Sequence, residues 1–191
     1  MQSKSIIRAA LLASALSLAG AFASAPSFAE MTVMVGGAPM YPSKNIVENA
    51  VNSKDHTTLV AAVKARGLVD TLETPGPFTV FAPTNEAFAK LPKGTVDTLL
   101  KPENKGQLTA VLTYHVVAGK MTAQDLADKV DEGGGQATLK TVQGEDLIVK
   151  RSGKKHLTIT DSKGDVAMIT IANVLQSNGV IHVINKVLIP S

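Results

Sequence analysis

The sequence predicts an α+β domain, with helices mainly in its first half and strands mainly in its second half. Apolar residues recur about every 3.6 residues before the triple glycine at 133–135, and about every 2 residues after it. An apolar segment at residues 78–82 interrupts the helical half and predicts an early strand. Because a strand needs partners, this segment must join the later sheet, and we expect one domain rather than two.

The N-terminus has the anatomy of a secretory signal peptide. Lys4 and Arg8 form a basic region, and a stretch of small apolar residues follows at 9–23. We expect cleavage after Ala29, which removes residues 1–29. The apolar stretch is shorter than the roughly 20 residues that a membrane span needs, so we expect no stable membrane insertion.

Net charge and cysteine content argue against nucleic-acid binding and exclude thiol-based functions. Removal of residues 1–29 takes away two basic residues and no acidic one, so the net charge falls from +3 to +1. A chain this close to neutral gives no electrostatic argument for nucleic-acid binding. The chain has no cysteine, which excludes disulfides, thiol chemistry and cysteine-ligated metal sites. We expect a secreted monomer in the periplasm, in the extracellular space or at the cell surface.

The first helices are predicted after a lead-in. Residues 30–44 are expected to be extended and irregular, because glycines and prolines break regular structure there. The domain is predicted to cover residues 45–191. Helical spacing predicts a first helix at 46–51 and a longer helical stretch at 59–72, for which Asp55 is the expected N-cap.

Further short helices follow the early strand. Thr84 is expected to cap the first of them, directly after the strand at 78–82. The next two are predicted at 96–100 and 108–114. Residues 122–126 begin with the spacing of a capping box and predict a last short helix.

The second half alternates apolar and polar residues, as half-buried strands do. Strands are predicted at 137–142, 146–150, 156–160, 166–174 and 180–188. The Asn178-Gly179 dipeptide is expected to form the turn before the last strand. Short connections of this kind predict a mainly antiparallel arrangement.

Three segments resemble the conserved motifs of the fasciclin family. Residues 78–91 resemble its first conserved box, residues 112–117 its tyrosine–histidine motif, and residues 178–188 its second box. They occur in the family's order, and the resemblance covers residues 45–190. The single-domain exported layout is similar to that of bacterial members, including secreted immunogenic proteins of mycobacteria. The resemblance implies a fasciclin-like β-sandwich or wedge with helices packed on one side.

The resemblance also implies an exported, non-enzymatic module that binds a cell-surface or matrix protein or glycan. In animal members, adhesion is attributed to the tyrosine–histidine region and to an Asp-Ile pair before the second box. The matching positions of the pair are Asn173 and Val174, so an amide replaces the carboxylate, which argues against integrin-type recognition through a metal. The predicted partner-binding residues are Leu112, Tyr114, His115, Val116, Asn173, Val174, Pro83, Thr84 and Asn85.

Several alternatives stay open at this point. Tyr114 and His115 end an apolar helix, where their side chains could simply satisfy buried backbone groups. A periplasmic small-ligand carrier would need an apolar cavity with a few convergent polar groups; an envelope stress protein is a further alternative. An enzyme would need a carboxylate within reach of His115. We expect no enzyme, metal or cofactor, because the chain lacks a Gly-x-Ser-x-Gly turn and its histidines lack the spacing of zinc ligands.

Overall fold

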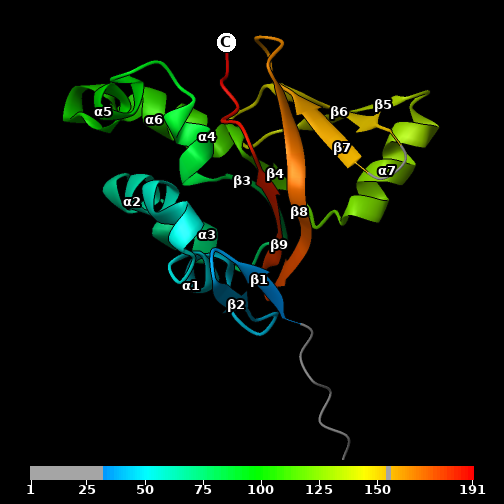
Figure 1. Cartoon of the computed structure of the whole chain (residues 1–191), viewed down its shortest axis with the longest axis horizontal. Helices are drawn as coiled ribbons and strands as arrows, with labels where there is room; N and C mark the ends of the chain where they lie inside the picture. Colours follow the sequence, from blue (N-terminus) through cyan, green and yellow to red (C-terminus); the bar gives the residue numbers. More distant parts are fainter. Residues whose placement is uncertain (1–31, 154–155) are drawn as a thin grey trace, which may run out of the picture.

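The computed structural model describes residues 32–153 and 156–191, in which most helices gather on one side of a folded β-sheet, while the helix at Ala123–Glu132 lies on the other side beside the strands that follow it (Figure 1). The strands are β1 (Val33–Val35), β2 (Ala38–Met40), β3 (Phe78–Pro83), β4 (Val116–Ala118), β5 (Gln136–Lys140), β6 (Asp146–Ser152), β7 (His156–Thr160), β8 (Val166–Gln176) and β9 (Gly179–Ile184). The α-helices are α1 (Ile46–Ala50), α2 (Thr57–Ala65), α3 (Val69–Glu73), α4 (Asn85–Ala89), α5 (Thr95–Leu100), α6 (Lys105–Tyr114) and α7 (Ala123–Glu132). Two short 3-10 helices are η1 (Lys54–His56) and η2 (Pro102–Asn104).

The predicted signal peptide, residues 1–29, lies outside the described residues. In the part of the chain that the structure describes, every helix is too short or too polar to cross a bilayer.

The main sheet has the strand order β4-β3-β9-β8-β7-β6-β5. Its neighbouring strands are antiparallel except for β3 and β9, which run parallel, with Phe78 opposite Gly179 and Pro83 opposite Ile184. The early strand therefore joins the later sheet, as the sequence predicted. The predicted α+β class is confirmed.

The hairpin between β8 and β9 is shifted by one residue from its predicted position. Its turn residues are Ser177 and Asn178, and Gly179 is already the first residue of β9. A side chain on Gly179 would collide with the carbonyl of Phe78. Glycine is needed here because the two backbones approach closely.

The side chain of Asn178 ties two helices to this hairpin. Its Oδ1 accepts a hydrogen bond from the backbone N–H of Ile46 at 3.0 Å. Its Nδ2 donates to the carbonyls of Leu72 at 2.6 Å and Thr74 at 3.1 Å. These contacts hold the start of α1 and the end of α3 against the β8–β9 turn.

Strands β3 and β9 are buried on both faces, which explains why their sequences are mainly apolar, apart from Thr79 and His182. On one face, Phe81 and Ile184 belong to a core between the two halves of the folded sheet, which α7 also covers. On the other face, Val80 and Ile181 belong to a core beneath α1 and the β1–β2 hairpin. A bridge from Val117 in β4 to Thr141 helps to close the folded sheet.

The lead-in differs from its prediction. Residues 33–40 form the antiparallel β1–β2 hairpin, although the sequence predicted no regular structure there. Gly36 and Gly37 adopt positive φ angles and form the turn of the hairpin instead of ending the strand. The side chains of Val35 and Met40 are buried in the core beneath α1.

Other boundaries also differ. Asp55 is not the N-cap of α2, because it lies inside η1 and His56 occupies the cap position. The last strand ends at Ile184 rather than at residue 188. Strand β4 was not predicted, because a three-residue strand directly after a helix is too short to show a period of 2.

We expect Asn178→Ala to destabilise the protein by about 3 kcal/mol, because one buried and two partly buried backbone groups lose their partner at once. Asn52→Ala is the matched control, because Asn52 is exposed and bonds only one carbonyl. The free energy of unfolding, measured with urea for both variants, checks this prediction. A loss below about 1 kcal/mol for Asn178→Ala would contradict it.

Candidate functional site

Tyr114 is fully buried at the C-terminal end of α6. Its hydroxyl donates to the carbonyl of Asp146 at 2.9 Å and accepts from the backbone N–H of Ser162 at 2.9 Å. The hydroxyl of Ser162 lies at 3.0 Å. Burial raises the pKa of Tyr114. The phenol therefore joins the helical half of the chain to β6 and to the loop after β7.

His115 follows Tyr114 and joins the helix to the C-terminal segment. Its Nδ1 donates to the carbonyl of Val111 at 2.7 Å, since a carbonyl can only accept. Its Nε2 accepts from the backbone N–H of Leu188 at 3.0 Å, so the ring is held as the neutral tautomer. Burial lowers the pKa of His115 to about 4, although the Val111 carbonyl and the charge of Asp161 act in the opposite direction.

These contacts weigh against the enzyme alternative for His115. Both ring nitrogens have backbone partners, and neither bonds a carboxylate. The Asp161 carboxylate accepts hydrogen bonds from the backbone of Lys163, Asp165 and Ile189 instead. A ring that is neutral, buried and doubly bonded has no free nitrogen with which to take a proton from a substrate.

The structure does not bring the predicted partner-binding residues together on one surface. Tyr114 packs between the halves of the sheet, Val116 and Val174 pack beneath α1, and Leu112 packs among the helices. The buried residues of the predicted set are Leu112, Tyr114, His115, Val116, Val174 and Pro83. In the described conformation these side chains face the interior, where a partner would not reach them. Partner binding by these side chains stays a prediction.

Thr84 and Asn85 are half-buried and organise the start of α4. The Thr84 hydroxyl accepts from the backbone N–H of Ala87, which confirms the predicted cap. The Asn85 side chain accepts from the backbone N–H of Thr58 and donates to the carbonyl of Lys54. Both residues therefore hold α4 against η1 and α2.

Asn173 is the exposed member of the predicted set. It has a φ of 59° at an irregularity in the β8–β9 pairing, a conformation that asparagine tolerates better than most residues. Its Oδ1 accepts from the backbone N–H of Ala123, the first residue of α7, at 2.7 Å. The structure thus places an amide on the surface where a β-strand meets the start of a helix.

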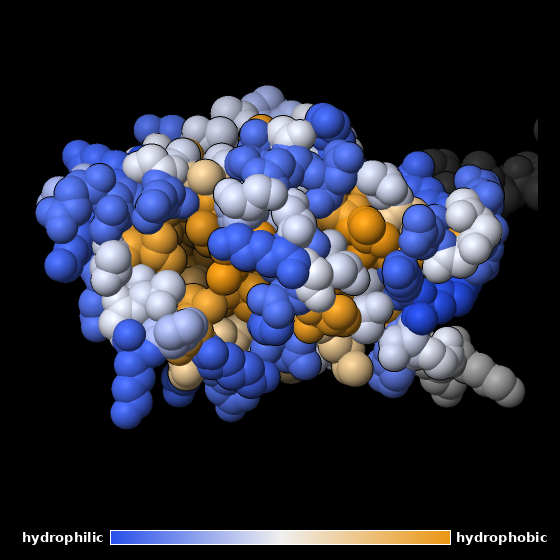
Figure 2. All heavy atoms as spheres, turned by 90° about the horizontal axis from the view of Figure 1, so that it is seen from above, coloured by the Kyte–Doolittle hydropathy of each residue, from blue (hydrophilic) through white to orange (hydrophobic). Residues whose placement is uncertain are grey.

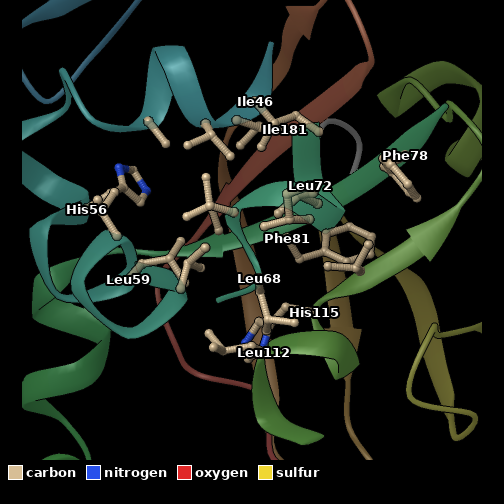
Figure 3. A pocket seen from close by; sticks show the side chains of 18 of the residues that line it. Ile46, His56, Leu59, Leu68, Leu72, Phe78, Phe81, Leu112, His115 and Ile181 are labelled. Atoms are coloured by element: carbon tan, nitrogen blue, oxygen red, sulfur yellow. The ribbon is translucent and has the colours of Figure 1, made fainter. Parts of the chain in front are cut away.

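A cavity lies between the helices α1, α2 and α3 and the face of β3 and β9 (Figure 3). It has a volume of about 90 Å³ and opens to the surface. Its walls are mainly apolar and include Ile46, Leu59, Leu72, Val80 and Ile181. Seen from above, apolar side chains also gather around a hollowed part of the surface (Figure 2). A cavity of this character is what the small-ligand alternative required.

His56 lines this cavity, and the sequence analysis did not identify it as a functional residue. Its Nδ1 lies 2.8 Å from the hydroxyl of Ser53, whereas Nε2 is buried without a hydrogen-bond partner. Burial lowers the pKa of His56, while the Ala82 carbonyl and the charge of Asp55 act in the opposite direction. The Ala82 carbonyl is close enough for this effect but does not form a hydrogen bond of normal geometry with the ring. In the sequence, the signal that could have pointed to this contact is the spacing of three residues between Ser53 and His56, which brings two side chains together on one helical turn.

We expect Tyr114→Phe to destabilise the protein by about 2 kcal/mol, because the Asp146 carbonyl and the Ser162 N–H lose their buried partner. Tyr41→Phe is the matched control, since Tyr41 is exposed. The free energy of unfolding of this control should fall by less than about 0.5 kcal/mol. Urea unfolding of both variants measures the two losses in free energy of unfolding. Equal losses would contradict the structural role of the Tyr114 hydroxyl.

The neutral state of His115 predicts a loss of stability in mild acid. Above its ordinary pKa of 6.5 the ring is neutral in both the folded and the unfolded chain, so the contribution is fully present. As the pH falls toward 4, the unfolded chain takes up the proton and the folded chain does not. The free energy of unfolding should therefore fall by about 2 kcal/mol between pH 7.5 and pH 5. The pKa values of His56 and His182 are also lowered by burial and act in the same direction.

Urea unfolding at several pH values measures this dependence. The His156→Gln variant is the control, because the side chain of His156 is exposed, and it should keep the same slope. A stability that stays constant over this range, or an NMR titration of His115 near its ordinary pKa, would contradict the prediction.

Comparisons with known proteins agree with this architecture. A model of the Fasciclin domain matches residues 54–190. Protein sll1483 of Synechocystis is 47% identical over 163 residues, which cover 84% of this chain and 82% of that protein. Immunogenic protein MPB70 of Mycobacterium bovis is 36% identical, over 74% of this chain and 66% of that protein.

Animal proteins match over a smaller share of their own length. The pig transforming growth factor-beta-induced protein ig-h3 (Sus scrofa) is 36% identical, over 78% of this chain and 20% of that protein. The structure of a FAS1 domain pair from the insect cell adhesion molecule Fasciclin I superposes with a TM-score of 0.69. It covers 78% of this chain and 52% of that chain at 19% identity, a likeness that shows the fold. With a family model that matches most of its length, the chain belongs to the fasciclin domain family.

Proposed function

We propose that this protein is an exported, non-enzymatic interaction module that attaches cells or surfaces by binding a protein or glycan. The observation that carries the proposal is the fasciclin domain itself, which accounts for residues 54–190. One structural relative is described as an insect cell adhesion molecule. Export to the periplasm, the extracellular space or the cell surface belongs to the same proposal and rests on the signal peptide predicted at residues 1–29.

The surface around Asn173 is the best-supported contact region within this proposal. Asn173 is exposed, its side-chain Oδ1 accepts a hydrogen bond from the backbone N–H of Ala123 at the start of α7, and it occupies a position to which the family resemblance assigns adhesion. A rigid, exposed amide can donate and accept hydrogen bonds, as protein and glycan partners require. Because an amide carries no charge, we propose direct hydrogen bonding rather than recognition through a shared metal ion.

A second candidate function is that of a small-ligand carrier, which the apolar cavity beneath α1, α2 and α3 favours. The two functions are compatible, because Asn173 is exposed and is not among the residues that line the cavity, although its neighbour Val174 is. No specific observation favours the envelope stress alternative.

We expect Asn173→Gly to weaken attachment by at least about fivefold, which corresponds to the loss of roughly one hydrogen bond. Glycine adopts the φ of Asn173 without strain, and water can replace the lost bond to Ala123, so stability should change little. Asn52→Gly removes an exposed amide elsewhere and serves as the control.

The measurement is the attachment of cells that lack the gene, complemented with the wild type or with either variant. Cells without the gene should attach poorly, and the wild type and Asn52→Gly should restore attachment. Unchanged attachment after deletion would overturn the adhesion proposal. Full restoration by Asn173→Gly would instead overturn the assignment of the contact region.

A further inference from the structure

We propose that the cavity between α1–α3 and the β3–β9 face binds a neutral, mainly hydrocarbon molecule bearing one hydroxyl group, which hydrogen-bonds to Nε2 of His56. This inference rests on the second candidate function, that of a small-ligand carrier, and deepens it by naming the class of ligand and the residue that orients it.

The walls of the cavity select for hydrocarbon. Helices α1, α2 and α3 contribute Ile46, Leu59 and Leu72, and the facing strands contribute Val80 and Ile181 (Figure 3). Such walls offer water almost no hydrogen bonds, and apolar cavities of this kind can stay dry and take up apolar molecules. The volume of about 90 Å³ exceeds the space of a single water molecule, and the opening lets a ligand extend toward the surface.

The position of His56 adds one polar requirement. The side chain is 4% exposed, and Nε2 has no hydrogen-bond partner among the described residues. Buried polar atoms in proteins almost always have a partner, so a free nitrogen in the lining of a cavity indicates a partner that comes from outside the chain. His115 also lines the cavity, but both of its nitrogens are already bonded, so His56 supplies the free imidazole nitrogen.

The contact with Ser53 explains why a hydroxyl is the best match. If the Ser53 hydroxyl donates to Nδ1 of His56, then Nε2 carries the proton and donates to the ligand. If Nδ1 instead donates to Ser53, then Nε2 accepts from the ligand. A hydroxyl can act as acceptor or as donor, so it satisfies both tautomers, whereas a carbonyl satisfies only the first.

The ligand is expected to be uncharged. Transfer of an ion into an apolar cavity is strongly unfavourable without a partner of opposite charge. Lys64 lines the cavity but is itself exposed, so it places no buried partner for an ion there. Burial keeps His56 neutral at pH 7 by lowering its pKa, so the ring offers a hydrogen bond rather than a charge.

The test compares toluene with p-cresol, two probes that differ by one hydroxyl. Their dissociation constants are measured by NMR titration of the wild type, of His56→Phe and of His156→Phe. We expect the ratio of the two dissociation constants to shift by about fivefold in favour of toluene when His56 is replaced. His156→Phe makes the same chemical change at an exposed position, the first residue of β7, and should keep the wild-type ratio.

A second measurement needs no variant and guards against misfolding of His56→Phe. The ¹⁵N signal of Nε2 in His56 should move when p-cresol is added to the wild type and stay in place with toluene. The ring signals of His115 should stay in place with both probes, because its nitrogens are already bonded.

The outcomes separate this inference from the function on which it rests. If both probes bind but the ratio and the His56 signal do not respond, the His56 assignment is overturned and a carrier of hydrocarbon remains. If a bound water stays on Nε2 when p-cresol enters, the assignment is also overturned. If neither probe binds up to its solubility limit, both the carrier function and the inference are overturned.

Discussion

The parallel pairing of β3 with β9 is the interaction on which the rest of the structure depends. It places Phe78 opposite Gly179. Strand β3, which lies within the helical half of the chain, thereby joins the sheet formed by β8, β7, β6 and β5 of the second half. The pairing needs a residue without a side chain at Gly179, because the carbonyl of Phe78 occupies that space. Next to it, Asn178 bonds the ends of α1 and α3. The walls of the cavity are therefore positioned by the same short turn.

The tyrosine–histidine motif illustrates how a motif associated with binding can be structural in its immediate contacts. Tyr114 and His115 end α6 and bond β6, the loop after β7 and the C-terminal segment through backbone groups. A substitution at either position acts first on the stability of the domain and on the position of these segments. Loss of adhesion after such a substitution is therefore ambiguous unless stability is measured as well. Asn173 avoids this ambiguity, because it is exposed and lies outside the core.

The site was only partly predictable from sequence. Thr84 was correctly predicted as a cap, because capping depends on residues within one turn of the helix. The burial of Tyr114 and the partners of its hydroxyl could not be predicted, because Asp146 and Ser162 belong to distant segments. The role of His56 was missed for a related reason. A missing hydrogen-bond partner becomes visible only when every neighbouring atom has been placed.

By itself the sequence determined most of the helices and the longer strands, since apolar periodicity and capping act over a few neighbouring residues. It also determined the α+β class and, through three motifs, the family resemblance. Only the tertiary structure decided that β3 runs parallel to β9, that residues 33–40 form a hairpin, and that most of the predicted binding residues face the interior. It alone produced the cavity and the free nitrogen of His56. These features arise where segments far apart in the chain meet, and their packing depends on all of them at once.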